Sequence, residues 1–134
     1  MGVKSNSLNL DLSNTTIHPI QLGIILKKLK HQRIENVIME ASSHGLKQNR
    51  LDGLKFNSGI FTNLSQDHLD YHKNLNDYLN AKLYLFKNLI KKKGNIIADD
   101  KIPEFKTINN IAKKKRLKII TLNDKKNDFR ILSH

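Results

Sequence analysis

The chain has 134 residues, no cysteine and a formal net charge of +12 at pH 7, from 24 Lys and Arg against 12 Asp and Glu. Its length suits one domain, and the lack of cysteine excludes a disulfide framework and a thiolate metal site. No apolar run approaches the roughly 20 residues that span a bilayer, and residues 1–13 show no signal-peptide pattern, so we expect a cytoplasmic protein with no membrane partner.

The excess positive charge is nearly all lysine and accompanies abundant Asn and Ile. Clustered Lys and Arg can bind nucleic acid by releasing phosphate counterions. A compositional bias accounts better for the lysines here, and the densest runs, 91–93 and 113–116, are expected at helix ends, where the helix dipole favours cations. We therefore expect no nucleic-acid partner, with a basic nucleic-acid-binding module as an alternative.

The first half of the chain predicts one helix and two short strands. Residues 1–14 have no sustained periodicity and predict an irregular segment or an unpaired edge. Pro19 suits the first position of a helix, because its missing N–H would be unpaired there, and apolar residues follow at helical spacing to about Arg33. Residues 36–39 and 59–62 are short apolar runs ending in polar residues, a pattern typical of buried parallel strands.

The second half alternates helices with strands. Residues 75–92 carry the strongest helical pattern, with Gly94 as the expected stop. Residues 95–98 predict a strand, 104–115 a helix and 117–122 another strand. This alternation predicts an α/β fold with a mostly parallel sheet flanked by helices. We expect an irregular segment at 1–14, one domain at 15–122 and a linker toward a further domain at 123–134.

Polar clusters follow the first two predicted strands. Glu40 stands beside Ser42 and Ser43, and Asp67 stands beside His68. In open α/β sheets ligands bind at the carboxyl ends of the strands, where carboxylate and imidazole groups can bind a divalent cation, Mg²⁺ fitting best. A structural role stays open, since Glu40 and the serines also suit caps of a following helix.

Lys82 and the Thr15–Thr16 pair also allow two interpretations. Lys82 lies inside the strongest predicted helix, where a single lysine is typically a solvated surface residue. Thr15 and Thr16 precede His18 and Pro19, so their hydroxyls either begin a helix or bind a ligand. No Gly-x-Ser-x-Gly elbow occurs, which argues against acyl hydrolysis.

Taken together, these motifs resemble the central domain of the Mur ligases, especially the branch that adds the third amino acid of the peptidoglycan stem peptide. The match runs from about Thr15 to Leu122 and includes residues 39–46, 48–50, 61–72 and 81–82 in order and spacing. It implies a partial, P-loop NTPase-like domain that uses Mg²⁺, with ATP as co-substrate.

The resemblance also implies roles for particular residues. Glu40 and His68 would hold Mg²⁺, and Lys82 would be the lysine that is carbamylated in the family. These three side chains would converge around one cation beside the nucleotide sugar. The remaining residues would bind the UDP-N-acetylmuramoyl dipeptide (Thr15, Thr16, Ser42, Gln48 and Arg50) or the nucleotide (Asn63 and Asp67).

The reaction implied by the resemblance is ATP-dependent amide formation in peptidoglycan biosynthesis. The D-glutamate carboxylate of UDP-N-acetylmuramoyl-L-alanyl-D-glutamate becomes an acyl phosphate, which the amine of the incoming amino acid attacks. Whether that amino acid is diaminopimelate or lysine stays open, because its contacts would lie in another domain.

The chain departs from the family pattern in two places. It has no Gly-x-x-Gly-Lys-Thr phosphate loop, and Thr16-Ile17-His18-Pro19 stands where the family has Thr-Thr-Pro-Asp-Pro. We therefore expect a fragment without the phosphate loop and the C-terminal domain, inactive alone, whose exposed apolar sheet surface favours self-association. A non-catalytic remnant that still binds the substrate is the alternative.

Overall fold

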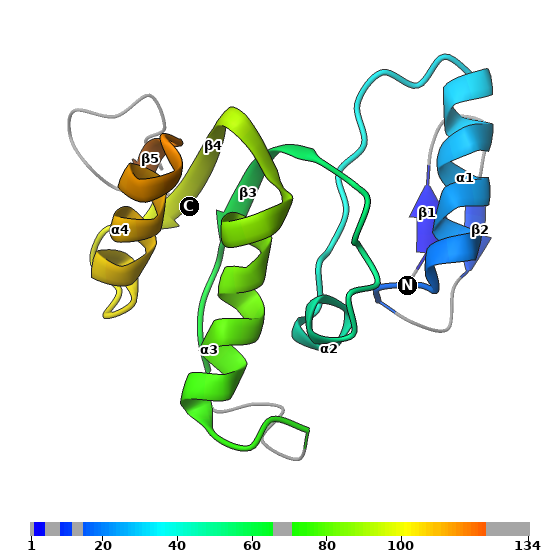
Figure 1. The fold of residues 1–134 in the computed structure, drawn as a ribbon. Helices are drawn as coiled ribbons and strands as arrows, with labels where there is room; N and C mark the ends of the chain where they lie inside the picture. Colours follow the sequence, from blue (N-terminus) through cyan, green and yellow to red (C-terminus); the bar gives the residue numbers. More distant parts are fainter. Residues whose placement is uncertain (1, 5–8, 12–14, 66–70, 123–134) are drawn as a thin grey trace, which may run out of the picture. The chain divides into compact units, whose positions relative to one another are not determined.

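The computed structural model describes residues 2–4, 9–11, 15–65 and 71–122. The chain divides into two compact units, Met1–Asp52 and Gly53–His134, and each is described by itself (Figure 1). Asp67, His68 and the predicted linker at 123–134 lie outside the described residues. Within the described parts, no helix is long and apolar enough to cross a membrane.

The described residues of the first unit form two short strands and two helices. β1 (Gly2–Lys4) pairs antiparallel with β2 (Asn9–Asp11), so the expectation of an irregular segment or unpaired edge is wrong for these residues. α1 (Pro19–His31) begins at Pro19 as predicted and buries Leu22, Ile25 and Leu29, whose spacing defines one helix face. α2 (Ser43–Lys47) is a single short helix.

The strand predicted at residues 36–39 is wrong. No strand is assigned between α1 and α2, and Ile38 is 98% exposed. A strand is stabilised by hydrogen bonds and side-chain packing with a neighbouring strand, and β propensity alone does not supply these contacts. Among the described residues no strand pairs with this run, so it remains unpaired.

The second unit is built on a parallel sheet with strand order β3-β4-β5. The strands are β3 (Phe56–Phe61), β4 (Ile90–Asp99) and β5 (Lys118–Leu122), and both pairings are parallel, as predicted. Ile96 of β4 lies opposite Gly59 on one side and Ile119 on the other. The α/β expectation is confirmed for this unit.

The helix predicted at 75–92 ends earlier than expected. α3 (Leu75–Tyr84) continues as a π-helix, η1 (Leu85–Leu89), and Ile90 then adopts extended backbone angles at the start of β4. Gly94 is therefore not a helix stop. A Cβ atom on Gly94 would lie 2.7 Å from the carbonyl oxygen of Asn57, so glycine here lets β3 and β4 approach closely.

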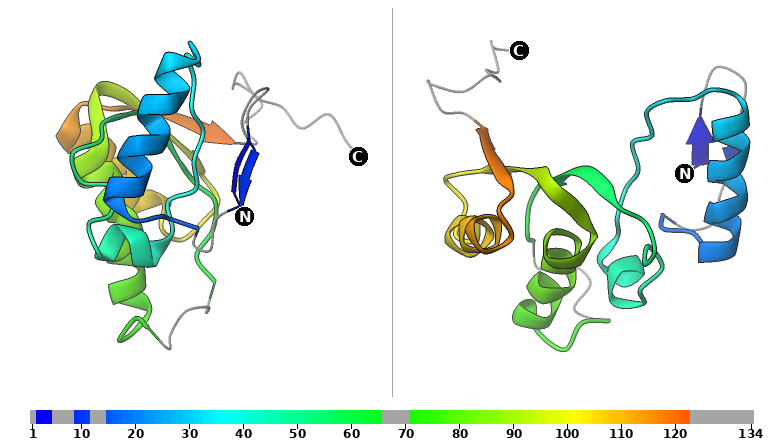
Figure 2. Two further views of the ribbon diagram at one scale, coloured as in Figure 1. Left: turned by 90° about the vertical axis from the view of Figure 1, so that its right-hand side faces the viewer. Right: turned by 45° about the horizontal axis from the view of Figure 1, so that its top comes forward.

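The α-helices described in this unit pack on one face of the sheet (Figure 2). α4 (Phe105–Lys115), close to the predicted 104–115, contributes Ile108 and Ala112 to the hydrophobic core. The core cluster consists of Phe61, Leu83, Phe86, Ile96, Ala98, Ile108 and Ala112. On the opposite face Ile60, Ile97 and Ile120 lie side by side in register, and Ile60 is 58% exposed.

Candidate substrate and metal site

Thr16 is the centre of a polar cluster in the first unit. Its hydroxyl oxygen accepts hydrogen bonds from the backbone N–H of Ser42 (2.9 Å) and from the Ser42 hydroxyl (2.9 Å). The same hydroxyl donates a longer bond to the Glu40 carbonyl oxygen (3.4 Å). Thr16 is only 2% exposed, so the loop before α1 is fixed to the loop before α2.

Arg50 joins the same cluster from the far side of α2. Its Nη1 donates to the Thr16 carbonyl oxygen (2.6 Å), and its Nε donates to Oε1 of Gln48 (2.8 Å). The guanidinium is half-buried, and its remaining N–H donors are not used in these bonds. Four residues predicted to bind substrate, namely Thr16, Ser42, Gln48 and Arg50, are thus connected by hydrogen bonds.

Ser42 is also the N-cap of α2, because its hydroxyl oxygen accepts from the backbone N–H of Gly45 at 3.1 Å. The structural interpretation of this serine is therefore confirmed, while its substrate role stays a prediction. Glu40 does not cap α2. Its carboxylate is exposed and has no hydrogen-bond or ion-pair partner among the described residues. Thr15 lies next to Thr16 and is half-buried.

Gly45 is a residue that the sequence analysis did not single out. A Cβ atom at this position would lie 2.5 Å from Cβ of Thr16 and 2.9 Å from its hydroxyl oxygen. Only glycine therefore lets α2 approach Thr16 closely enough for the Ser42 bonds to form. The signal in the sequence is a glycine inside a short helix, where no turn requires it.

In the second unit, Lys82 lies beside the carboxyl end of β3. Its ammonium donates to the Asn63 carbonyl oxygen (3.0 Å) and lies 5.0 Å from the ring centroid of Tyr78 and 5.8 Å from that of Phe61. Cations are attracted to aromatic ring faces at such distances. Lys82 is half-buried and makes these three contacts, so it is not a freely solvated surface lysine.

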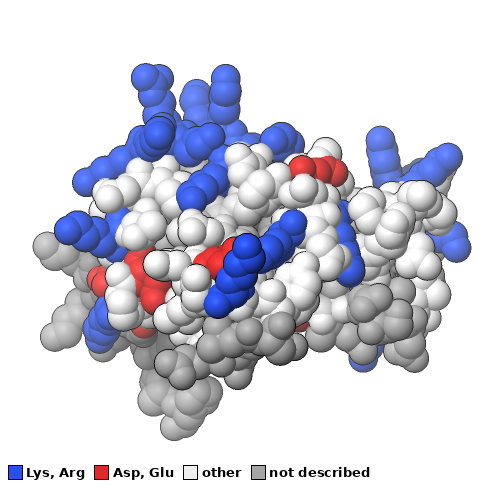
Figure 3. All heavy atoms as spheres, turned by 60° about the horizontal axis from the view of Figure 1, so that its bottom comes forward, with Lys and Arg blue, Asp and Glu red and all other residues white. Residues whose placement is uncertain are grey.

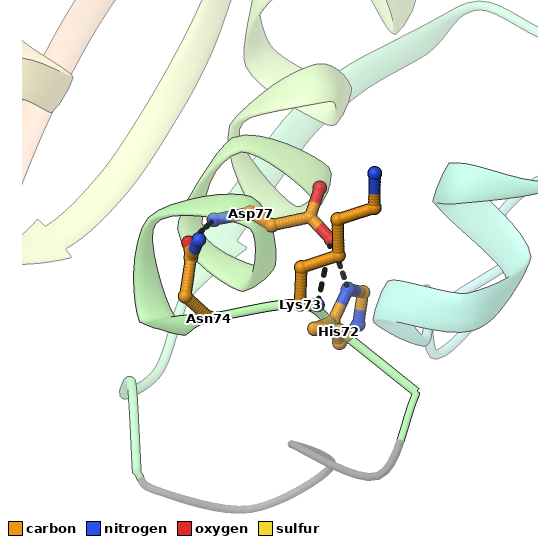
Figure 4. A network of polar contacts seen from close by, with 4 residues as sticks. All are labelled: His72, Lys73, Asn74 and Asp77. Carbon is orange, nitrogen blue, oxygen red and sulfur yellow. Dashed lines mark hydrogen bonds and ion pairs between the residues drawn. The ribbon is translucent and has the colours of Figure 1, made fainter.

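The start of α3 is fixed by a second polar network (Figure 4). Asn74 caps the helix by accepting from the Asp77 backbone N–H (2.9 Å), and the Asp77 carboxylate accepts from the Lys73 backbone N–H (3.2 Å). His72 is 1% exposed, lies 3.7 Å from Asp77 and stacks on Tyr78 with 4.9 Å between ring centroids. The network positions Tyr78 under Lys82.

The predicted metal site is only partly represented. In the ranges that the structure describes, no group of three His, Asp or Glu side chains could hold a metal ion. His68 and Asp67 lie outside those ranges, and Glu40 and Lys82 belong to different units. Their convergence around one cation stays a prediction.

The chain belongs to the Mur ligase middle domain family, whose model matches residues 1–133. Several curated relatives are similar over the middle of the chain, and each is named UDP-N-acetylmuramoyl-L-alanyl-D-glutamate–2,6-diaminopimelate ligase. The relative from Buchnera aphidicola is 48% identical over 103 residues, or 75% of this chain and 21% of its own length. The relative from Mesorhizobium japonicum is 46% identical over 101 residues (74% and 21%).

A third relative, from Leptospira borgpetersenii, is 45% identical over 89 residues, which cover 66% of this chain. The matches span 18 to 21% of the length of these relatives. Their similarity therefore concerns the middle domain, and the activity of a whole ligase does not follow from it.

Proposed function

We propose that this chain holds UDP-N-acetylmuramoyl-L-alanyl-D-glutamate for an ATP-dependent, cytoplasmic ligase of peptidoglycan biosynthesis. The observation that carries the proposal is the hydrogen-bonded cluster of Thr16, Ser42, Gln48 and Arg50. Four residues expected to bind one substrate come from separate segments and meet at one place. By the relatives' names, the amino acid joined to this substrate is 2,6-diaminopimelate.

The cluster has the chemistry that a nucleotide sugar with a terminal carboxylate requires. The Ser42 hydroxyl donates to Thr16 and accepts from the Gly45 N–H, so in the described bonds it keeps one acceptor lone pair for a sugar or amide donor. The buried Thr16 hydroxyl already accepts two bonds and donates one, so its part is to fix Ser42 in place. Among the described residues, Arg50 keeps N–H donors beyond its two hydrogen bonds, and a guanidinium binds a carboxylate or phosphate with paired, charge-assisted bonds. Because Thr16 and Ser42 are fixed by each other and by the cap of α2, little ordering is needed on binding.

The proposal includes Mg²⁺, with Glu40 and His68 as its ligands. The exposed Glu40 carboxylate, which has no partner among the described residues, suits an oxygen-preferring cation. When bound, the ion neutralises negative charge that moves between phosphate and carboxylate oxygens. Lys82, once carbamylated, would carry an anionic group near the carboxyl end of β3, with Asn63 beside it and Asp67 farther along the chain. We propose these roles by resemblance to the family.

Isothermal titration of the chain with UDP-N-acetylmuramoyl-L-alanyl-D-glutamate tests the proposal. Arg50→Lys removes the planar fork, and Ser42→Ala removes the hydroxyl, so each should weaken binding at least about tenfold. Lys27→Gln on the exposed side of α1 is the matched control and should bind like the unmodified chain. Binding that is unmeasurable in the unmodified chain, or equal in all variants, overturns the proposal.

A ligation assay with ATP, Mg²⁺, the same substrate and diaminopimelate adds the second readout. The sequence has no Gly-x-x-Gly-Lys-Thr loop to hold the ATP phosphates, so we expect binding without amide product. Product formed by the chain alone would show that this segment supplies more of the catalytic machinery than we propose.

A further inference from the structure

A basic hollow lies at the amino end of the parallel sheet in the second unit. Its volume is about 480 Å³, and it is an open depression in the surface, not an enclosed cavity. Its lining includes eight cationic side chains and no acidic one: Lys55, Lys87, Lys91, Lys92, Lys93, Lys114, Lys115 and Arg116. Lys82 lies at the other end of the same sheet, beside the end of β3.

Helix-end stabilisation explains only part of this charge. Residues 113–115 lie in the last turn of α4, as expected, but residues 91–93 belong to β4. Phe56 pairs with Ile90 and Ser58 with Asn95, so residues 91–94 of β4 stand opposite Asn57 alone. This bulge directs a run of lysines to the hollow, and bulges recur next to binding sites because they re-aim side chains.

Two basic residues at the hollow also adopt unfavourable backbone conformations. Lys93 (φ 61°) and Arg116 (φ 55°) both adopt the left-handed conformation, which costs energy for any residue with a Cβ atom. Arg116 occupies the C-cap of α4, where glycine is the usual residue. The hollow is completed by η1, since Lys55 donates to the Asn88 carbonyl oxygen at 2.8 Å.

No acidic side chain of the described residues lines the hollow. Among the described residues, the structure gives Lys91, Lys92, Lys114, Lys115 and Arg116 no hydrogen-bond or ion-pair partner for their side chains. Like charges in one hollow repel each other, and a bound anion removes that repulsion. In Figure 3, Lys and Arg side chains gather along the upper left of the molecule, where no acidic side chain interrupts them.

We propose that this hollow binds a small, multiply charged phosphate compound carrying a di- or triphosphate group. Of the apolar lining residues, Phe86 is buried and Ile90 and Leu117 are half-buried, so none offers the exposed apolar side chain of a membrane anchor. Phe86 is 2% exposed and offers no face on which a nucleic-acid base could stack. A compact phosphate chain therefore fits better than a lipid surface or a nucleic acid.

Calorimetric titration of the full chain with sodium tripolyphosphate tests the proposal at about 50 and 200 mM salt. We expect one bound tripolyphosphate per chain and binding that weakens at the higher salt. The variant Lys91→Gln/Lys92→Gln/Lys114→Gln/Lys115→Gln should bind at least about tenfold more weakly. The control Lys27→Gln/Lys28→Gln/Lys30→Gln/Lys106→Gln removes the same charge from exposed positions outside the hollow and should bind within about twofold of the unmodified chain.

Equal losses in the two variants overturn the proposal, because net charge alone would then explain binding. No binding at the lower salt, or single-stranded RNA or anionic vesicles that bind more tightly per phosphate, also overturns it. A parallel ATP titration identifies the source: equal affinities indicate recognition of the triphosphate alone, and tighter ATP binding indicates a nucleotide.

Amide chemical shifts give a readout that needs no variant. Tripolyphosphate should move the signals of residues 91–93 and 114–117 and leave those of Thr16, Ser42 and Gly45 in place. The reverse pattern would overturn the assignment of the hollow. Because the nucleotide-sugar substrate is tested at Thr16 and Ser42, failure of one proposal leaves the other intact.

Discussion

Residues 36–39 and 59–62 have similar sequence patterns and different structures. Each is a short apolar run that ends in polar residues, yet Ile38 is 98% exposed and unpaired among the described residues, whereas Phe61, at the end of β3 (Phe56–Phe61), is 3% exposed in a sheet. β3 pairs with β4 along its length and packs against the core helices. The difference shows that hydrophobic pattern marks a candidate strand, while pairing and packing determine whether the strand forms.

The two candidate functional regions also differ in the interactions that stabilise them. After residues 36–39, the polar loop is fixed by side-chain bonds between Thr16, Ser42 and the cap of α2. After β3, Asn63 is fixed by Lys82 from a helix that packs on the sheet. The first region therefore depends on individual hydrogen bonds and one close glycine contact, and the second depends on the hydrophobic core.

Truncating the sheet core should have the largest effect. Ile96 is fully buried in β4, so Ile96→Ala should lower the free energy of unfolding by about 2–5 kcal/mol. The paired variant Ile38→Ala alters the exposed run and should change it by less than about 0.5 kcal/mol. Urea titration followed by circular dichroism measures both, and similar losses would show that Ile38 and Ile96 are equally buried.

Crowding the polar cluster should have the next largest effect. Gly45→Ala places a methyl group against Thr16 and should cost about 1–3 kcal/mol of stability in the first unit while weakening substrate binding. Gly23→Ala is the matched control in α1, because its Cβ would meet nothing within 4 Å, and it should be neutral or slightly stabilising. Amide hydrogen exchange of α2 resolves the local loss. Unchanged protection in the Gly45 variant contradicts the close approach.

Removing the cap of α3 should have a smaller effect. Asn74→Ala deletes the side chain that accepts from the Asp77 backbone N–H and should cost about 1 kcal/mol. Asn76→Ala, at an exposed position in the same helix, should stabilise slightly because alanine is the better helix former. Thermal unfolding of both variants measures the difference, and an equal shift in Tm would show that the Asn74 bond adds nothing.

The smallest stability change is expected on the open face of the sheet. Ile60→Thr keeps a β-branched residue but makes the row of Ile60, Ile97 and Ile120 less apolar, so stability should change little and self-association should decrease. Ile20→Thr, on exposed α1, is the control and should leave association unchanged. Sedimentation velocity measures both. A monomeric unmodified chain contradicts the predicted self-association.

The sequence predicted the elements whose local pattern agrees with their tertiary partners. Three elements, α1, α4 and β5, begin and end near the expected residues. In each, the local sequence pattern and the apolar face favour the same structure. The prediction was wrong for residues 90–94, where the helix was expected to continue to Lys92 and stop at Gly94, because pairing of Ile90 with Phe56 turns the chain into β4. Pairing between distant segments cannot be read from local spacing.

In the candidate site, too, contacts between distant residues could not be predicted from the sequence. The resemblance to the Mur ligases predicts one substrate site that includes Thr16, Ser42, Gln48 and Arg50. Hydrogen bonds connect these four residues. The role of Gly45 could not be predicted, since it depends on a contact with Thr16 that only the folded chain creates. The roles of Glu40, His68 and Lys82 at one cation stay predictions.

Amide chemical shifts of the isotope-labelled chain, recorded during addition of UDP-N-acetylmuramoyl-L-alanyl-D-glutamate, test most directly whether the polar cluster is a substrate site. We expect saturable shifts at Thr16, Ser42, Gly45 and Arg50, with the signals of residues 91–93 unmoved. Saturating substrate that leaves the cluster signals in place, or that moves only signals elsewhere, would contradict the substrate-holding function.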